Sequence, residues 1–258
     1  MNDLYLTNVE KINNIFVKRE DKYTINNVCG GKARVVNELV KNGIKKGYKN
    51  FVTCGSRDSR QCEVVAKICE YFGVKSHLFI PSGNDTYITL SIAQTNGATI
   101  HRTKVGYNNV LVSQSSLYAK ENDYLYIPFG LECQDTIDIN MHQVQNIPKD
   151  VKRIIVPCGS GMNMIAIIKG LEYYGMIDKE VVGVIVGKDP KNVFKKYIQN
   201  DLFNRTLIKY SFEHYPFDYH YRPKEITIGN IELDEVYEEK CIPFIRENDL
   251  MWIVGKKI

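Results

Sequence analysis

The chain has 258 residues, of which 44% are hydrophobic and 25% are charged, and its formal net charge is +4. This composition is typical of a globular protein, and no run approaches the roughly 20 apolar residues of a membrane-spanning helix, so we expect no membrane contact. The N-terminus lacks the basic and apolar regions of a signal peptide, which predicts a cytoplasmic protein, and seven single cysteines without a CxxC pair argue against disulfides and against a metal site.

Short apolar runs alternate with longer helical patterns along the chain. We expect strands at residues 15–17, 51–54, 76–80, 99–101, 124–127, 153–156 and 181–186. We expect helices at residues 33–39, 60–72, 86–96, 109–121 and 162–174. Residues 189–225 are expected to form a helix and an irregular loop, and residues 233–244 a helix before a closing strand at 250–254. Because strands that alternate with helices need crossover connections, the sequence predicts an α/β fold with mostly parallel sheets and helices on both faces.

Three turns between a predicted strand and a predicted helix are rich in glycine or serine. Ligands of parallel sheets bind at such turns because free backbone amides and the positive end of the helix dipole converge there. The clearest turn is VPCGSGMNM at residues 156–164, which lacks the GK[ST] ending of a nucleotide P-loop and the spacing of a dinucleotide motif. It favours a phosphate held by backbone amides, although a tight turn also needs glycine for its conformation alone.

The second turn is TCGSRDSRQ at residues 53–61, just before a predicted helix. Its hydroxyl groups and the first amides of that helix are suited to holding a carboxylate. Simple capping of the helix by Ser56, Asp58 or Ser59 explains the same residues, so both interpretations stay open at this point.

The third turn is VCGGKAR at residues 28–34, in which Lys32 follows two glycines at the start of a predicted helix. Helix amides disfavour a positive charge there, which predicts an amine that acts as a nucleophile toward an aldehyde. A single lysine is more commonly a solvated surface residue, and the turn by itself does not decide between the two.

The order of these motifs resembles one enzyme family. The segment FVKREDKYTINNVCGGKARVVNELV, residues 16–40, is similar to the N-terminal motif of pyridoxal-phosphate enzymes of fold type II, the tryptophan-synthase-β-like family. The likeness is strongest to the branch of aminocyclopropane-carboxylate deaminase and D-cysteine desulfhydrase. In that branch KRED, here residues 18–21, precedes a glycine-rich turn with the Schiff-base lysine, which the resemblance places at Lys32.

Three further matches follow in the family's order. The serine-rich turn and its helix match GSRDSRQCEVVAKICEYFG at residues 55–73, and the glycine-rich phosphate loop matches residues 159–163. The segment LDEVYEEKCIPFI at residues 233–245 resembles the family's helix that places a tyrosine near the substrate, which points to Tyr237. The resemblance therefore spans nearly the whole chain.

The resemblance implies pyridoxal 5'-phosphate as the cofactor and a two-lobed fold. Residues 1–38 and 128–258 would form the larger cofactor-binding lobe, and residues 39–127 the smaller lobe. Lys32 would carry the cofactor and move a proton at the α-carbon of the substrate, with Ser56 and Tyr237 as further catalytic residues. The cofactor phosphate would lie on Gly159, Ser160, Gly161, Met162 and Asn163. The substrate carboxylate would lie on Ser56, Arg57, Asp58 and Ser59.

Three residues depart from the family pattern. Arg57 stands where the named branch has an asparagine that contacts the ring hydroxyl of the cofactor, and Asp58 stands where a histidine is usual. Near the chain end, IVG replaces an HTG-like turn, so Val254 takes the place of the ring-nitrogen partner. Because valine supplies neither an acid nor a hydroxyl, this alignment predicts a weaker electron sink.

The resemblance implies a lyase, deaminase or isomerase that acts at the α-carbon of an amino acid or an amino-acid-like adduct. Compact phage-encoded relatives linked to hypermodified pyrimidines in DNA suggest a first alternative, an enzyme that remodels an aminoacyl-modified pyrimidine in phage DNA, with DNA as a partner in the host cytoplasm. A second alternative is a non-catalytic binding module on the same fold, motivated by Arg57 and Val254. Relatives of this fold usually pair, which implies a homodimer.

Overall fold

The structure is a computed structural model that describes residues 5–57, 59–83, 88–104, 108–187, 189–199, 206–217, 221 and 226–255. Contacts between residues divide the chain into two compact units. The large unit comprises the described parts of Met1–Tyr23, Cys29–Gly31 and Glu132–Ile258, and the small unit those of Thr24–Val28 and Lys32–Leu131. Residues 39–127, the predicted smaller lobe, fall inside the small unit, whereas the predicted lobe boundaries stay a prediction.

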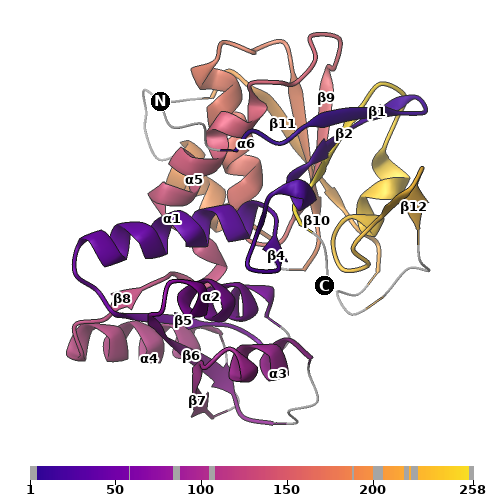
Figure 1. Ribbon diagram of the computed structural model, residues 1–258. Coiled ribbons are helices and arrows are strands. Elements are labelled where there is room, and N and C mark those ends of the chain that lie inside the picture. The colour runs from indigo at the N-terminus through magenta and orange to yellow at the C-terminus, as the bar shows by residue number, and fades with distance from the viewer. Residues whose placement is uncertain are drawn as a thin grey trace. The chain divides into compact units, whose positions relative to one another are not determined.

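The large unit is built on a six-stranded sheet with the order β1–β2–β14–β9–β10–β11 (Figure 1). Its strands are β1 (Val9–Ile12), β2 (Ile15–Arg19), β9 (Arg153–Cys158), β10 (Glu180–Ile185), β11 (Lys209–His214) and β14 (Leu250–Ile253). Every neighbouring pair is parallel except β1 with β2. Since β14 lies between β2 and β9, strands from the two ends of the chain are side by side.

The side chains of the central strand β9 alternate between two apolar layers. Ile154 and Val156 pack in the layer that contains helix α6 (Met162–Tyr173), whereas Ile155 packs in a second layer with Met251 of β14. All four side chains are fully buried. Consecutive strand residues point to opposite faces, so a strand covered on both faces has a continuous apolar sequence rather than an alternating one.

Shorter elements complete the large unit and lead into the small one. The helices are α5 (Gln134–Asn140), α7 (Lys191–Phe194), the 3₁₀ helices η1 (Glu20–Lys22), η3 (Met141–Val144) and η5 (Glu239–Phe244), and the π-helix η4 (Lys195–Gln199). The two-residue strands β12 (Thr227–Ile228) and β13 (Ile231–Glu232) pair with each other, as do β3 (Thr24–Ile25) and β4 (Val28–Cys29). Helix α1 (Gly31–Lys45) follows β4, and the chain passes between the units in its first turn.

The small unit has a four-stranded parallel sheet with the order β7–β6–β5–β8. The strands are β5 (Asn50–Cys54), β6 (Lys75–Pro81), β7 (Thr99–Thr103) and β8 (Leu125–Tyr126), and the helices besides α1 are α2 (Arg60–Tyr71), α3 (Ile88–Thr95), α4 (Asn108–Glu121) and η2 (Phe129–Leu131). Val52 packs with Leu111 of α4, whereas the ring of its neighbour Phe51 lies against Gly43 of α1. Helices therefore cover both faces of this sheet.

The predicted α/β class with mostly parallel sheets is confirmed. Each predicted strand is present to within two residues at either end, and helices α2, α4 and α6 end within one residue of the prediction. Helix α1 runs further than the predicted residues 33–39, and residues 86–87 of the predicted helix 86–96 lie outside the described residues. In the part of the chain that the structure describes, no helix combines the length and the apolar character needed to cross a membrane.

The prediction for residues 189–225 is wrong in one respect, because the segment contains strand β11. This strand pairs in parallel with β10 along its full length. Its sequence KYSFEH alternates, and the rings of Tyr210 and Phe212 both pack against Phe194, at centroid distances of 5.6 and 4.9 Å. Period-two alternation over so few residues resembles an irregular segment until a neighbouring strand is known.

The prediction of a helix over residues 233–244 is wrong for its first half. Only Glu239–Phe244 is helical, as the 3₁₀ helix η5, and Pro243 lies inside it. Before it, the carboxylate of Asp234 accepts hydrogen bonds from the N–H groups of Val236 (2.8 Å) and Tyr237 (3.2 Å). An Asp side chain that binds the backbone two and three residues further on stabilises a turn rather than a regular helix.

The packing of α6 on η3 gives a stability prediction at Gly170. A Cβ at this position would overlap the carbonyl oxygen of Met141. We expect Gly170→Ala to lower the free energy of unfolding by about 1–3 kcal/mol, the usual cost of overpacking. The control on the same helix is Lys169→Ala, which removes a partly exposed side chain and its i,i+3 pair with Glu172 (3.3 Å) and should change the free energy of unfolding by only about 0.5 kcal/mol. Urea unfolding of both variants measures this, and equal stabilities would contradict the close α6–η3 packing.

Candidate functional site

The loops that follow the parallel strands of the large unit carry one half of the candidate site. Because β2, β14 and β9 are parallel, the chain leaves the sheet at the same edge after Arg19, Ile253 and Cys158. Ligands of open parallel sheets bind at this edge, where loop amides and helix N-termini converge.

The glycine turn Gly159–Gly161 connects β9 to helix α6 at that edge. Gly161 is the residue before the first turn of α6 and has a φ of 84°, which favours glycine. A Cβ there would lie 2.9 Å from Pro190 and 3.1 Å from the ring of Phe194. Because the N-cap residue Gly161 has no side chain, it forms no side-chain hydrogen bond with the first-turn amides of the twelve-residue helix α6. The N–H groups of a helix N-terminus point along the helix axis toward a place where an anion such as a phosphate can bind.

Tyr237 lies against this glycine turn. A Cβ at Gly159 would be 3.2 Å from Cε1 and 3.6 Å from the hydroxyl of Tyr237. The structure therefore places the predicted tyrosine, which lies just before η5, next to the predicted phosphate loop. These two segments are about eighty residues apart in the chain. A side chain at position 159 would require the ring of Tyr237 to move by a few tenths of an ångström.

Glu238 is a candidate residue that the sequence reasoning missed. Its side chain is fully buried, and burial raises its pKa well above the usual range, with the nearby Asp234 charge adding to the effect. Oε1 accepts a hydrogen bond from the N–H of Val254 (2.7 Å), whereas Oε2 has no hydrogen-bond partner among the described residues. The available signal was its place directly after Tyr237. The structure thus puts an acidic group on the backbone of Val254, where the sequence alignment expected no acid.

Val254 also connects to the turn that precedes Lys32. Its carbonyl oxygen accepts a hydrogen bond from the N–H of Gly31 (3.2 Å). Gly30 has a φ of 93°, and a Cβ there would overlap the same carbonyl oxygen. Glycine at position 30 is needed for this close approach, which ties the first residue of α1 to the end of β14.

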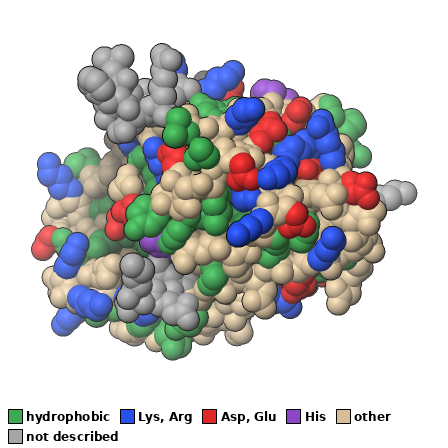
Figure 2. Space-filling model, turned by 90° about the horizontal axis from the view of Figure 1, so that it is seen from above, with side chains coloured by type: hydrophobic (Ala, Val, Ile, Leu, Met, Phe, Trp, Pro, Cys, Tyr) green, Lys and Arg blue, Asp and Glu red, His purple; other side chains and the backbone are tan. Residues whose placement is uncertain are grey.

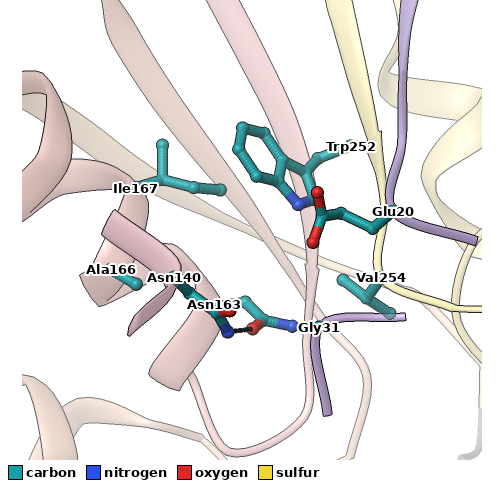
Figure 3. A pocket seen from close by; sticks show the side chains of 8 residues that line it. All are labelled: Glu20, Gly31, Asn140, Asn163, Ala166, Ile167, Trp252 and Val254. Carbon is teal, nitrogen blue, oxygen red and sulfur yellow. Dashed lines mark hydrogen bonds between the residues drawn. The ribbon is translucent and has the colours of Figure 1, made fainter. Parts of the chain in front are cut away.

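A small pocket lies beside Gly31 in the large unit (Figure 3). A Cβ at Gly31 would meet Asn140 Nδ2 at 3.3 Å, Asn163 Oδ1 at 3.6 Å and Glu20 Oε2 at 3.6 Å. The amide of Asn140 donates to Asn163 Oδ1 at 3.4 Å. The pocket is lined by Glu20, Gly31, Asn140, Asn163, Ala166, Ile167, Trp252 and Val254. Asn163, which was predicted as a phosphate ligand, therefore lines this pocket, and its side-chain oxygen lies close to Gly31.

The KRED motif forms buried polar contacts at the end of β2. The Lys18 ammonium donates to the carbonyl oxygen of Thr7 (2.7 Å) and to Asn146 Oδ1 (2.8 Å). The Arg19 guanidinium binds Asp21 through two parallel hydrogen bonds of 2.9 and 2.8 Å. Charge-assisted, two-pronged bonds of this kind fix geometry well. These residues stabilise the edge of the sheet that leads to the glycine turn before Lys32.

The small unit carries Lys32 and the serine turn. Lys32 is the second residue of α1 and is half-buried. Burial raises the pKa of Cys62, in the first turn of α2, to about 12, while a hydrogen bond to Ser59 and the positive charge of Lys32 act in the opposite direction. The structure therefore brings Lys32, Ser59 and Cys62 into one neighbourhood within this unit.

The side chain of Ser59 does not cap helix α2. Ser59 is the N-cap residue, but its hydroxyl makes no capping hydrogen bond, and it packs where a Cβ of Gly55 would overlap it. Ser56 is exposed at the start of the turn, and the guanidinium of Arg57 lies over Gly83. Asp58 lies outside the described residues. The N–H of Cys62 donates to the carbonyl oxygen of Ser59 (3.1 Å), and the N-terminus of α2 is the end of the helix dipole that attracts an anion such as a carboxylate.

Comparisons with known proteins show the family and the fold of the chain. Residues 4–203 match the family described as pyridoxal-phosphate dependent enzyme. A solved structure of an ACC deaminase homologue is 19% identical with a TM-score of 0.83, covering 97% of this chain and 89% of that chain. Threonine deaminase isoform 2 from Solanum lycopersicum is 14% identical with a TM-score of 0.68, covering 98% and 84%. A hydrogen sulfide-producing enzyme from Fusobacterium nucleatum is 14% identical with a TM-score of 0.68, covering 98% and 95%.

A search of curated protein sequences finds no match. At the identities of the solved structures, the likeness shows a shared fold. The family match itself extends over more than half of the chain, including Lys32, the serine turn and the glycine turn. The chain therefore belongs to the family of pyridoxal-phosphate-dependent enzymes, which use pyridoxal 5'-phosphate as their cofactor.

Proposed function

We propose that the chain is an enzyme that acts at the α-carbon of an amino acid or an amino-acid-like adduct, and that Lys32 carries its pyridoxal phosphate. The position of Lys32 supports this most directly. It follows the glycine turn that is hydrogen-bonded to Val254, and its charge reaches Cys62 in the first turn of α2. In the chain, Lys32 directly follows the glycine turn Gly30–Gly31. In space, its positive charge acts on Cys62 in the first turn of α2, next to the serine turn.

The residues of the large unit fit the cofactor. Helix α6 offers first-turn amides without a side-chain cap, and positions 159 and 161 are glycines that neighbouring side chains crowd. We assign the cofactor phosphate to the amides of Gly159, Ser160, Gly161 and Met162, with the side chain of Asn163. Glu238 supplies a buried carboxyl oxygen without a hydrogen-bond partner among the described residues. A raised pKa favours its protonated form, which suits a hydrogen bond with a heteroaromatic nitrogen.

Each catalytic residue has a role that follows from its functional group. When bound, the cofactor supplies a conjugated ring that spreads the charge developing at the substrate α-carbon. Lys32 accepts or returns the proton at that carbon, which requires its amine to be neutral. Ser56, Ser59 and the first amides of α2 hold the substrate carboxylate. Tyr237 holds a proton at its hydroxyl beside the glycine turn, and we assign it to proton transfer at the leaving group.

The names of the similar structures support chemistry at the α-carbon. They include an ACC deaminase homologue, a threonine deaminase and a serine racemase from maize. Deamination, lyase and isomerase reactions of amino acids share an early change of charge at the carbon that bears the amine. We therefore propose a lyase, deaminase or isomerase, with an amino acid as the substrate class.

The other functional interpretations stay predictions. Figure 2 shows a face on which Lys and Arg side chains are interspersed with Asp and Glu side chains, rather than a purely basic surface. Nucleic-acid binding depends on basic patches, so this face gives no particular support to a DNA substrate. A non-catalytic binding module would not require Lys32, Ser59 and Cys62 to lie close together.

We also propose a homodimer in the cytoplasm, and light scattering of the purified protein tests the dimer.

Uptake of the cofactor tests the proposed function. Purified protein is mixed with pyridoxal phosphate, dialysed and examined by visible absorption, and a panel of amino acids is then added. We expect a retained visible band that shifts with some amino acids, because the substrate amine takes the place of the lysine amine. Protein that retains no pyridoxal phosphate, or a retained band that no amine alters, would contradict the enzyme proposal.

A further inference from the structure

Arg57 occupies a defined place at the edge of the small sheet. It belongs to the turn after β5, and its guanidinium crosses to the turn after β6, where it lies over the backbone of Gly83. A Cβ at Gly83 would overlap Nη1 of Arg57 and lie 2.8 Å from its Cζ. Gly83 has a φ of 147°, in the region that favours glycine. The close approach therefore depends on both residues.

This place is where a ligand of the small unit is expected. Strands β5 and β6 are parallel neighbours, so the turns at Arg57 and Gly83 leave the sheet at the same carboxyl edge. The first turn of α2 begins at that edge, and the charge of Lys32 acts on Cys62 within it. A substrate bound beside Lys32 and the first turn of α2 would lie at the sheet edge from which the turn of Arg57 also leaves.

The substrate α-carboxylate already has a binding place in the proposed site. The first amides of α2, with Ser56 and Ser59, offer uncharged donors and the positive end of a helix dipole. A guanidinium adds a full positive charge and a planar fork of donors that matches carboxylate and phosphate groups. The guanidinium of Arg57 lies over Gly83, in the turn after the neighbouring strand.

We propose that Arg57 recognises a second anionic group on the substrate. The substrate class would then be amino acids whose side chain ends in a carboxylate or a phosphate. This inference rests on the proposed function, and it makes Arg57 the residue that determines specificity.

The experiment compares acidic amino acids with uncharged partners of similar shape. Aspartate is paired with asparagine, glutamate with glutamine, and O-phosphoserine with serine, in both stereoisomers. Dissociation constants come from the shift of the cofactor absorption band in the loaded protein. The wild type should bind at least one acidic compound about 10- to 100-fold more tightly than its partner, the usual effect of one charge-assisted contact. The carboxylate and phosphate pairs distinguish the two anions.

Two substitutions at Arg57 isolate the role of its charge and shape. Arg57→Asn should weaken binding of the acidic compound about 10- to 100-fold while changing that of its uncharged partner by less than about twofold. Arg57→Lys keeps the charge but loses the fork, so it should retain part of the preference. Uptake of pyridoxal phosphate is measured for both variants, so that a loss of cofactor is distinguished from a loss of substrate preference.

A substitution at Gly83 tests the same proposal without altering Arg57. Gly83→Ala should displace the guanidinium and reduce the acidic preference. Gly97→Ala is its control, because Gly97 also has a positive φ (70°) but has no atoms within 4 Å of its Cβ position. Both variants carry the cost of an alanine at positive φ, and only Gly83→Ala should alter specificity.

The outcomes separate this proposal from the proposed function. Protein that binds no pyridoxal phosphate overturns both. A loaded protein that shifts equally with acidic and uncharged amino acids overturns the role of Arg57 and leaves the enzyme proposal standing. An equal loss for both members of a pair in Arg57→Asn would mean that Arg57 serves the α-carboxylate or the turn itself, which also contradicts the proposal.

Discussion

Replacing Lys32 with alanine is expected to lower the rate of amino-acid turnover by about 10²- to 10⁴-fold, the range that a positioned acid–base group contributes. The same change should abolish covalent attachment of pyridoxal phosphate, because alanine has no amine to bond to the aldehyde. Lys32 lies in the first turn of α1 beside Cys62, so the substitution removes an amine from the proposed site and leaves the helix intact. Alanine favours helix formation, and folding should be unaffected.

Borohydride reduction followed by peptide mass analysis measures the attachment. In the wild type, the mass of the reduced cofactor should appear on the peptide that contains Lys32. Lys41→Ala is the matched control, because Lys41 lies on the same helix, is partly exposed and pairs with Glu38 at 3.2 Å. It should label and turn over as the wild type does. Label on another lysine, or full activity in Lys32→Ala, would show that the site has been assigned to the wrong amine.

Replacing Glu238 with glutamine is expected to change activity and stability in opposite directions. Glutamine keeps an oxygen for the N–H of Val254 but removes the acid proposed to contact the cofactor ring. We expect turnover to fall about 2- to 10-fold, which corresponds to the loss of one hydrogen bond between uncharged groups. The pyridoxal phosphate should still bind, because its phosphate and Lys32 contacts are unchanged.

The stability effect follows from the raised pKa of Glu238. Its burial holds the folded-state pKa above the unfolded value of about 4.5, so the folded state binds more protons. The wild type therefore loses stability as the pH rises from about 4.5 to the folded pKa, by at most about 1.4 kcal/mol per pH unit. Glu238→Gln lacks this titration, and it should be more stable than the wild type at neutral pH but not below pH 4.5.

Urea unfolding of the cofactor-free proteins between acidic and neutral pH measures this difference. Glu247→Gln is the control, because it makes the same chemical change at an exposed residue. A wild type and Glu238→Gln that show the same pH dependence would mean that the carboxyl of Glu238 is not held in its protonated form. Unchanged turnover in Glu238→Gln would remove it from the cofactor site.

Local patterns in the sequence were sufficient for much of the fold. Strands β2, β5 to β10 and β14 were predicted because each is a short apolar run, whereas β1 was not predicted. Helix α2 was predicted because its apolar residues recur at helical spacing before Gly73. The end of α2 was also predictable from the local sequence, because Gly73 has a φ of 66° and its N–H donates to the carbonyl oxygen of Glu70. The missed strand β11 lacks such a signal, because its polar residues face solvent at the sheet edge.

The candidate site divides in the same way. Lys32, the serine turn and the glycine turn were identified from residues that are adjacent in the chain. The role of Glu238 was not, because its raised pKa depends on burial and on a hydrogen bond from Val254, which the chain order does not reveal. The contact of Arg57 with Gly83 also depends on two turns that only the pairing of β5 with β6 brings together.

The sequence by itself determined the alternation of strands and helices, the glycine turns and the position of Lys32 after Gly30 and Gly31. These features arise from backbone preferences and burial patterns within a few residues, which a sequence records directly. Only the tertiary structure decided that β14 lies between β2 and β9 and so brings Val254 to Gly31 and Glu238. Such contacts depend on the free energy of packing segments that are distant in the chain, which no local pattern records.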